Sequence, residues 1–267
     1  DRNRTSPFAF TGNKFEFRAV GSSQSISGPL VILNTIVSES LDYIATELEK
    51  ATKGDARKLN GAVQKLLQEL IKEHKAIIFN GDGYSEAWQK EAAKRGLPNL
   101  KNTVDALEAI TGDNEAAALF EKYNVLSARE LAARNEIYTE RYCKDINTEA
   151  MLCHDIAKSM ILPAAYRYQG ELASTAAALK AAGVKSPDTS SLETLTGLVS
   201  DLEKGIVTLE HALAHKSSGS TLDHAKHYRD EVLPAMLGIR KIADKLEVII
   251  ADDIWPLPTY QEMLFIR

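Results

Sequence analysis

The chain has 267 residues, of which 44% are apolar and 26% charged, and its formal net charge is −5. These values are typical of one large globular domain or two small ones, and they exclude a disordered or a fibrous protein. The negative charge disfavours binding to the phosphate backbone of nucleic acid, and no apolar run reaches the ~20 residues that span a bilayer. Two cysteines make no disulfide framework, which favours a reducing compartment, the cytoplasm.

The first 21 residues differ from the rest because they hold four of the seven phenylalanines. Within them Lys14, Glu16 and Arg18 alternate with two phenylalanines, so an extended chain places the three charged side chains on one face. Two interpretations are open: an edge strand with a solvated charged face, or a strand that holds a charged ligand. The chain also starts without Met, which suggests a fragment or a processed product.

From Leu30 onward the apolar period changes to three or four residues, which predicts a long amphipathic helix, and a second helix follows Asp55. The predicted stripe of the first helix consists of Leu30, Leu33, Val37, Leu41, Ile44 and Leu48. The run 76–79 is typical of a short strand, and the run 80–83 is typical of a turn.

Three short helices are expected next. Ser85 is a capping residue for the first, which ends at Gly96, and the others cover residues 103–111 and 113–123. Asn124 is suited to a left-handed stop after the last of them.

Long helices fill the remainder. Ser127 and Glu130 form a capping box that opens one towards Pro163, where it kinks and continues to about residue 183. A second box, Ser190 with Glu193, opens another to about residue 215. A last helix runs over residues 221–252 with a kink at a proline, and an extended tail follows. The expected fold is therefore mainly α, a bundle of long antiparallel helices preceded by a short strand segment.

Residues 3–8 and 12–18 together resemble the late catalytic strand of glutamine synthetases, in particular of the type III branch. Residues 78–85, 94–100 and 255–260 are similar to the helical C-terminal region of that branch, so the resemblance covers the whole chain. It implies that the strand belongs to an α/β catalytic domain. The implied division is residues 1–55, the end of the catalytic domain, and residues 56–267, a helical extension.

The resemblance also implies a function. Glutamine synthetases join ammonia to glutamate at the expense of ATP through a γ-glutamyl phosphate, with Mg²⁺ or Mn²⁺ at the phosphates. The expected partners are these small molecules and further copies of the chain in a homo-oligomer of stacked rings, with neither nucleic acid nor membrane.

Four residues match the family's motif. The resemblance assigns Glu16 to a metal ion and Arg18 to the substrate carboxylate, and it assigns Arg4 and Lys14 to phosphate and ATP. Ala9 stands where other branches carry a further phosphate-binding Arg, and Lys14 stands where several relatives have Arg, so two contacts of the motif differ.

The family's other metal ligands, its catalytic residues and its nucleotide loop precede this strand and are not in the sequence. One acidic ligand does not build a multi-metal site, so the chain alone is expected to be inactive. The alternatives are a non-catalytic helical module for oligomerisation or interaction, and an unrelated four-helix protein with an added strand.

Other candidate sites are weaker. Four histidines lie near the ends of two predicted helices, where either a metal site or plain exposed side chains are possible and the latter is favoured: His211, His215, His224 and His227. Cys143 and Cys153 are expected to be buried structural thiols.

Overall fold

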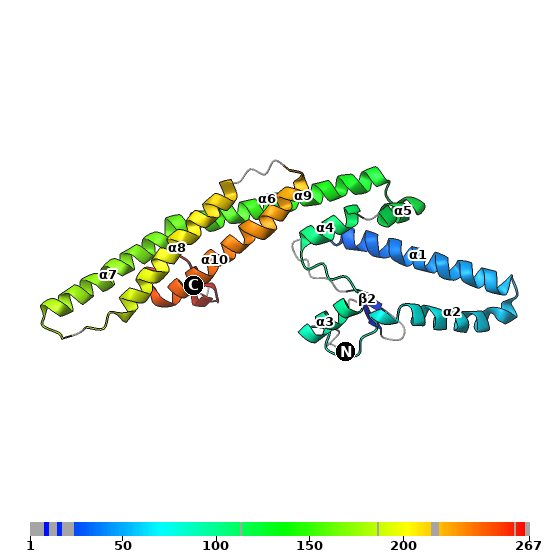
Figure 1. Ribbon diagram of the computed structural model, residues 1–267, viewed down its shortest axis with the longest axis horizontal. Coiled ribbons are helices and arrows are strands. Elements are labelled where there is room, and N and C mark those ends of the chain that lie inside the picture. The colour runs from blue at the N-terminus through cyan, green and yellow to red at the C-terminus, as the bar shows by residue number, and fades with distance from the viewer. Residues whose placement is uncertain are drawn as a thin grey trace. The chain divides into compact units, whose positions relative to one another are not determined.

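Of residues 1–23, the computed structural model describes only the backbone of 8–10 and 15–17. It further describes residues 24–112, 114–185, 187–214, 219–258 and 260–264 (Figure 1). The chain divides into two compact units, residues 1–132 and 133–267. Both are mainly helical, as the sequence predicts. The boundary that the sequence predicts at residue 55 is a different one: it marks the end of a catalytic domain, and it stays a prediction.

In the first unit, β1 (Phe8–Phe10) pairs antiparallel with β2 (Phe15–Phe17). The register places Ala9 opposite Glu16 and a phenylalanine opposite a phenylalanine on either side of that pair. That this segment belongs to an α/β catalytic domain stays a prediction.

Two long helices, α1 (Ser27–Thr52) and α2 (Leu59–Glu73), follow and pack on each other. The turn between them uses Lys53 and Gly54 at positive φ, the left-handed conformation that ends many helices. Asp55 then caps the single turn η1 (Ala56–Lys58) by accepting a hydrogen bond from the Arg57 amide. The two predicted helices are therefore confirmed, together with the break between them.

The strand predicted at residues 76–79 is wrong. The chain forms the 3₁₀ turn η2 (Lys75–Ile77) and then runs on without regular structure. Arg95 explains the difference, because its guanidinium donates hydrogen bonds to the carbonyls of Ala76 and Ile78. Backbone carbonyls that already accept hydrogen bonds from a side chain do not need the amide donors of a neighbouring strand.

Three short helices agree with prediction: α3 (Glu86–Lys94), α4 (Thr103–Gly112) and α5 (Asn114–Lys122). Ser85 caps α3 by accepting from the Trp88 amide, and Asn124 takes the left-handed conformation after α5.

The second unit contains the predicted long helices. They are α6 (Ala128–Ile156, which begins in the first unit), α7 (Leu162–Ala181), α8 (Ser190–Ala214), α9 (Thr221–His227) and α10 (Leu233–Ile249), followed by the short α11 (Tyr260–Leu264). α8 packs against both α7 and α10, and these three helices lie side by side in Figure 1.

Both predicted proline kinks appear as π-helical turns. η3 (Ala157–Ile161) joins α6 to α7 just before Pro163, and η4 (Tyr228–Val232) joins α9 to α10 just before Pro234. A proline lacks an amide donor and its ring crowds the preceding turn, and a wider turn removes that conflict.

Of the two predicted capping boxes, one is confirmed and one is wrong. Ser127 and Glu130 form the predicted capping box, since the Glu130 carboxylate accepts from the Ser127 amide and hydroxyl. The second predicted box is wrong by one residue: Thr189, not Ser190, donates its hydroxyl to Glu193. Neighbouring hydroxyl residues are nearly equivalent as caps, so sequence alone does not separate them.

The core of the second unit is centred on α8. Leu195, Leu202 and Leu209 are completely buried and repeat every seven residues, facing Ile239 and Leu246 of α10 among others. Trp255 of the tail closes the core from its C-terminal side. Within the described part of the chain, no helix is both long enough and apolar enough to cross a membrane.

Candidate functional site

Glu16 lies in β2, and its backbone position opposite Ala9 is the only part of the predicted catalytic strand's site that the structure places. Arg4, Lys14 and Arg18 lie outside the described residues. Their assignments to metal, phosphate and substrate therefore stay predictions.

The helix after this strand has an unusual surface. Only Thr35 and Thr52 of α1 are buried, whereas much of the predicted apolar stripe is exposed. Large exposed apolar side chains of α1 are Leu30, Ile32, Ile36, Val37, Leu41 and Tyr43. A soluble protein rarely leaves so many apolar side chains of one helix uncovered, so α1 has the properties of an interaction surface.

A polar cluster ties α1 to α5. The Lys122 ammonium lies 2.6 Å from the Glu39 carboxylate and 3.2 Å from that of Asp42, and the Tyr123 hydroxyl donates to both carboxylates. These hydrogen bonds lower the pKa of both carboxyl groups and raise the pKa of Lys122. The cluster is well exposed and fully paired, so it fits a structural link better than a reaction centre.

A second cluster joins η3 and α6 to α8. Glu210 accepts from the Lys158 ammonium at 2.5 Å and from the His154 ring at 2.9 Å, and Asp155 contacts the other ring nitrogen. The two donors lower the pKa of Glu210 to about 2, Lys158 having the larger effect. Hydrogen bonds to Glu210 and then Asp155 raise the pKa of His154 above its ordinary value.

These shifts predict a pH-dependent stability. Because the pKa of His154 is raised in the folded state, its protonated ring stabilises the fold. This stabilisation is complete below about pH 6.5 and is lost as the pH rises through the pKa of the folded state. Because the pKa of Glu210 is lowered in the folded state, its carboxylate stabilises the fold above about pH 4.5. This stabilisation is lost as the pH falls towards 2. We expect His154→Gln to lower the free energy of unfolding more at pH 5.5 than at pH 8.5 in urea titrations.

The Glu210→Gln background is the control for that experiment. Once Glu210 is neutral, adding His154→Gln is expected to cost clearly less at pH 5.5, because the main partner of the imidazolium is gone. Equal costs at the two pH values in the parent background would contradict the assignment.

The weaker candidates do not gain support. Among the described residues, no three His, Cys, Asp or Glu side chains are grouped as metal ligands, and His215 is outside them. The His227 ring lies 2.8 Å from the Ala212 carbonyl, which links α9 to α8. Cys143 and Cys153 form no disulfide, and both are half-buried rather than buried as predicted. Partial burial raises the pKa of both thiols, and their structural role stays a prediction.

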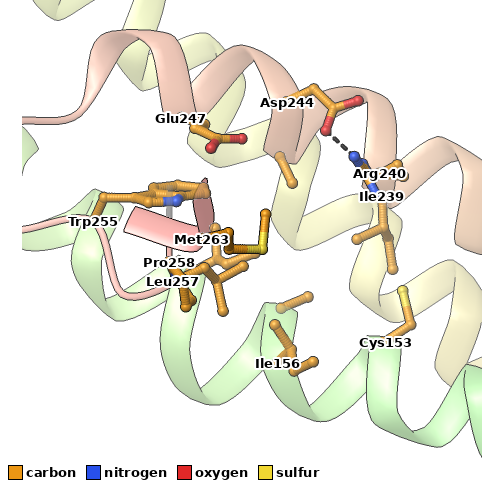
Figure 2. Close-up of a pocket in the computed structure, with 13 residues that line it drawn as sticks. Cys153, Ile156, Ile239, Arg240, Asp244, Glu247, Trp255, Leu257, Pro258 and Met263 are labelled. Atoms are coloured by element: carbon orange, nitrogen blue, oxygen red, sulfur yellow. Dashed lines mark hydrogen bonds and ion pairs between the residues drawn. The ribbon is translucent and has the colours of Figure 1, made fainter. Parts of the chain in front are cut away.

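A cavity of about 380 Å³ lies in the second unit, a feature that the sequence analysis did not predict. It is bounded by the end of α6 with η3, by α10 and by the C-terminal segment (Figure 2). Its wall is mostly apolar, with Ile156, Ile239, Leu257 and Met263 among its side chains. The polar part of the wall comes from Arg240, Asp244, Glu247 and Trp255.

The chain is similar to known proteins over its whole length. Residues 62–180 match the family model described as glutamine synthetase C-terminal domain. The chain is 38% identical over 278 residues to the Type-3 glutamine synthetase of Dictyostelium discoideum, with 100% of the chain and 37% of that protein covered. It is 34% identical over 281 residues to the glutamine synthetase of Bacteroides fragilis (strain YCH46), again with 100% and 37% coverage. The chain thus spans about 37% of the length of these relatives.

Proposed function

Because the chain belongs to the glutamine synthetase family and matches the C-terminal part of type III members, we propose that it is part of an ATP-dependent ligase. This ligase joins ammonia to glutamate through a γ-glutamyl phosphate and works in the cytoplasm as a homo-oligomer of stacked rings. The observation that carries the proposal is the 38% identity to a type-3 enzyme across the entire chain.

The proposed role of this chain in the reaction is to supply one charged strand. Glu16 offers a carboxylate oxygen to a divalent cation, Arg18 holds the glutamate carboxylate through its two-pronged guanidinium, and Arg4 with Lys14 contacts phosphate. The pairing of Ala9 with Glu16 in the β1–β2 ladder supports an extended conformation at this point.

The described residues of this chain do not by themselves fit a metal site. Among the described residues no group of three potential ligands exists, and the motif supplies one carboxylate. A Mg²⁺ or Mn²⁺ ion would therefore need ligands beyond the described residues, and we derive no reaction step through it. We accordingly propose that the chain alone does not catalyse the reaction.

This proposal is tested with the 267-residue chain and with a chimera in which the chain replaces the matching residues of the Dictyostelium enzyme. We expect no glutamate-dependent phosphate release from ATP with the chain alone, and glutamine formation with the chimera. Turnover by the isolated chain near that of the intact relative would refute the requirement for further residues. An assembled but inactive chimera would refute the catalytic role.

The exposed apolar side chains of α1 favour a second candidate, a helical module whose main role is assembly. The two candidates differ in their readout. If the chain serves assembly alone, the chimera forms the oligomer of the parent enzyme in sedimentation experiments, and substitutions in the charged strand leave its activity unchanged.

A further inference from the structure

We propose that the exposed apolar side of α1 is the packing surface for the β1–β2 ladder, and that this contact turns the Glu16 face of the ladder away from α1. The contact lies within this chain, so it is tested independently of the proposed function. The apolar side of α1 is uncovered among the described residues, and the ladder packs extensively on no other described element. Residues 18–26 join the two surfaces.

The apolar side of α1 is broad. At about 3.6 residues per turn, six large apolar side chains occupy roughly half of the helix circumference. They are between 42% and 60% exposed, and we call them the apolar arc: Leu30, Ile32, Ile36, Val37, Leu41 and Tyr43. Leu33 and Ile44, which are half-buried, lie between them on the same side of the helix.

The opposite side of α1 is polar and faces the rest of its unit. Thr35 is only 3% exposed, and its hydroxyl donates to the Val31 carbonyl at 2.7 Å. Glu39 and Asp42 on this side form the ion-pair link to α5. A surface helix normally buries its apolar side and exposes its polar side. The arrangement in α1 is the reverse, which indicates that a further layer of the protein covers the apolar arc.

The β1–β2 ladder has a matching apolar face. Residues directly opposite in an antiparallel pair share a face, as do residues two apart in one strand. The register therefore places all four phenylalanine positions on one face, and Ala9 with Glu16 on the other. A two-stranded ladder alone is only marginally stable in water, and packing against a helix is one way to stabilise it. Burial of the phenylalanine face on α1 leaves Glu16 pointing away from that helix.

The linker between the two surfaces favours this ladder as the occupant of the arc. Residues 18–26 reach about 30 Å when extended, at ~3.3 Å per residue. The arc from Leu30 to Tyr43 is about 20 Å long, at ~1.5 Å per residue. The ladder therefore reaches every part of the arc, and its tether gives it a far higher effective concentration there than a separate copy of the chain has. A second copy on α1 would also leave the phenylalanine face of the ladder without a partner.

A photo-cross-link tests the contact directly. In the 267-residue chain, Leu41→p-benzoylphenylalanine replaces the most exposed side chain of the arc with a group that bonds to nearby C–H groups under illumination. We expect mass spectrometry to find this cross-link within residues 8–17 of the same chain. Ser38→p-benzoylphenylalanine is the matched control, because Ser38 is exposed on α1 outside the arc, and it should not cross-link to these residues.

Mixing labelled and unlabelled chains separates a contact within one chain from a contact between copies. A cross-link from position 41 to a second copy would instead support the assembly module and would overturn the proposal. The absence of any cross-link from this position to residues 8–17 overturns it as well.

Amide hydrogen exchange tests whether the contact stabilises the ladder. Val37→Asp places a charge in the arc, and we expect the amides of residues 8–10 and 15–17 to exchange at least about tenfold faster. Ser38→Asp adds the same charge at the next position, outside the arc, and should change these rates less than about twofold. The amides of α1 report whether the helix itself persists in each variant. Equal rates in the parent and in Val37→Asp, or equal acceleration by the two charges, overturn the proposal.

Discussion

Glu16→Gln is expected to lower glutamine formation by the chimera at least about 100-fold. Glutamine keeps the size of the side chain but replaces a carboxylate, the donor that Mg²⁺ and Mn²⁺ prefer, by a neutral amide. Changing a residue that only supports a metal ligand already costs about 10–100-fold in activity or metal affinity, so a direct ligand should cost at least the upper value. The measurement is the rate of glutamine formation at saturating ATP and glutamate.

A metal-specific readout separates ligation from a structural effect. If Glu16 binds a cation, the concentration of Mg²⁺ for half-maximal residual activity rises in the variant, while the oligomer seen by sedimentation is unchanged. Glu47→Gln is the matched control, because Glu47 lies on α1 and is paired with Lys50 at 2.7 Å on the surface. A Glu16→Gln chimera as active as its parent would mean that the charged face of the strand has no role at the metal.

The helices were predictable because their signals are local. The apolar period identified α1, α2 and the long helices of the second unit, and hydroxyl residues such as Ser85 and Ser127 marked where two helices begin. The positions of the π turns were also predictable, since Pro163 and Pro234 disturb a helix through their own covalent structure.

The errors arose where a distant residue decides the local structure. The apolar run at residues 76–79 has the composition of a strand, but Arg95 hydrogen-bonds two carbonyls in this region from 17 and 19 residues away. The exposed side of α1 is a related case. Its period correctly predicts a helix, but whether an apolar stripe is covered depends on what packs against it.

The candidate sites show the same contrast. The resemblance assigns Glu16 because a short motif carries the chemistry, and this assignment stays a prediction since its side chain is not described. The cavity was not foreseen because residues from three separate segments form its wall: the α6–η3 junction, α10 and the tail. The one available signal was Trp255, a large aromatic residue with a polar group in a segment rich in proline.

Leu202→Ala is expected to lower the free energy of unfolding of the second unit by about 2–5 kcal/mol, the range for a large core side chain reduced to alanine. Leu202 is completely buried at the middle of the α8 heptad stripe, between two other fully buried leucines. Packing around α8 is also close: a Cβ atom at Gly205, one turn further on, would lie 3.2 Å from the Ile239 side chain. A cavity left at Leu202 therefore has rigid walls that collapse only in part.

Leu237→Ala provides the control for this prediction, since Leu237 of α10 is 59% exposed and its loss should cost less than about 1 kcal/mol. Urea titrations measure the free energy of unfolding of each variant. Amide hydrogen exchange then assigns the loss of stability to the second unit or to the first. If Leu202→Ala and Leu237→Ala cost the same, the stripe of α8 is not the core that stabilises this unit. A large loss for Leu202→Ala that spreads to α1 and α2 would instead mean that the two units unfold as one.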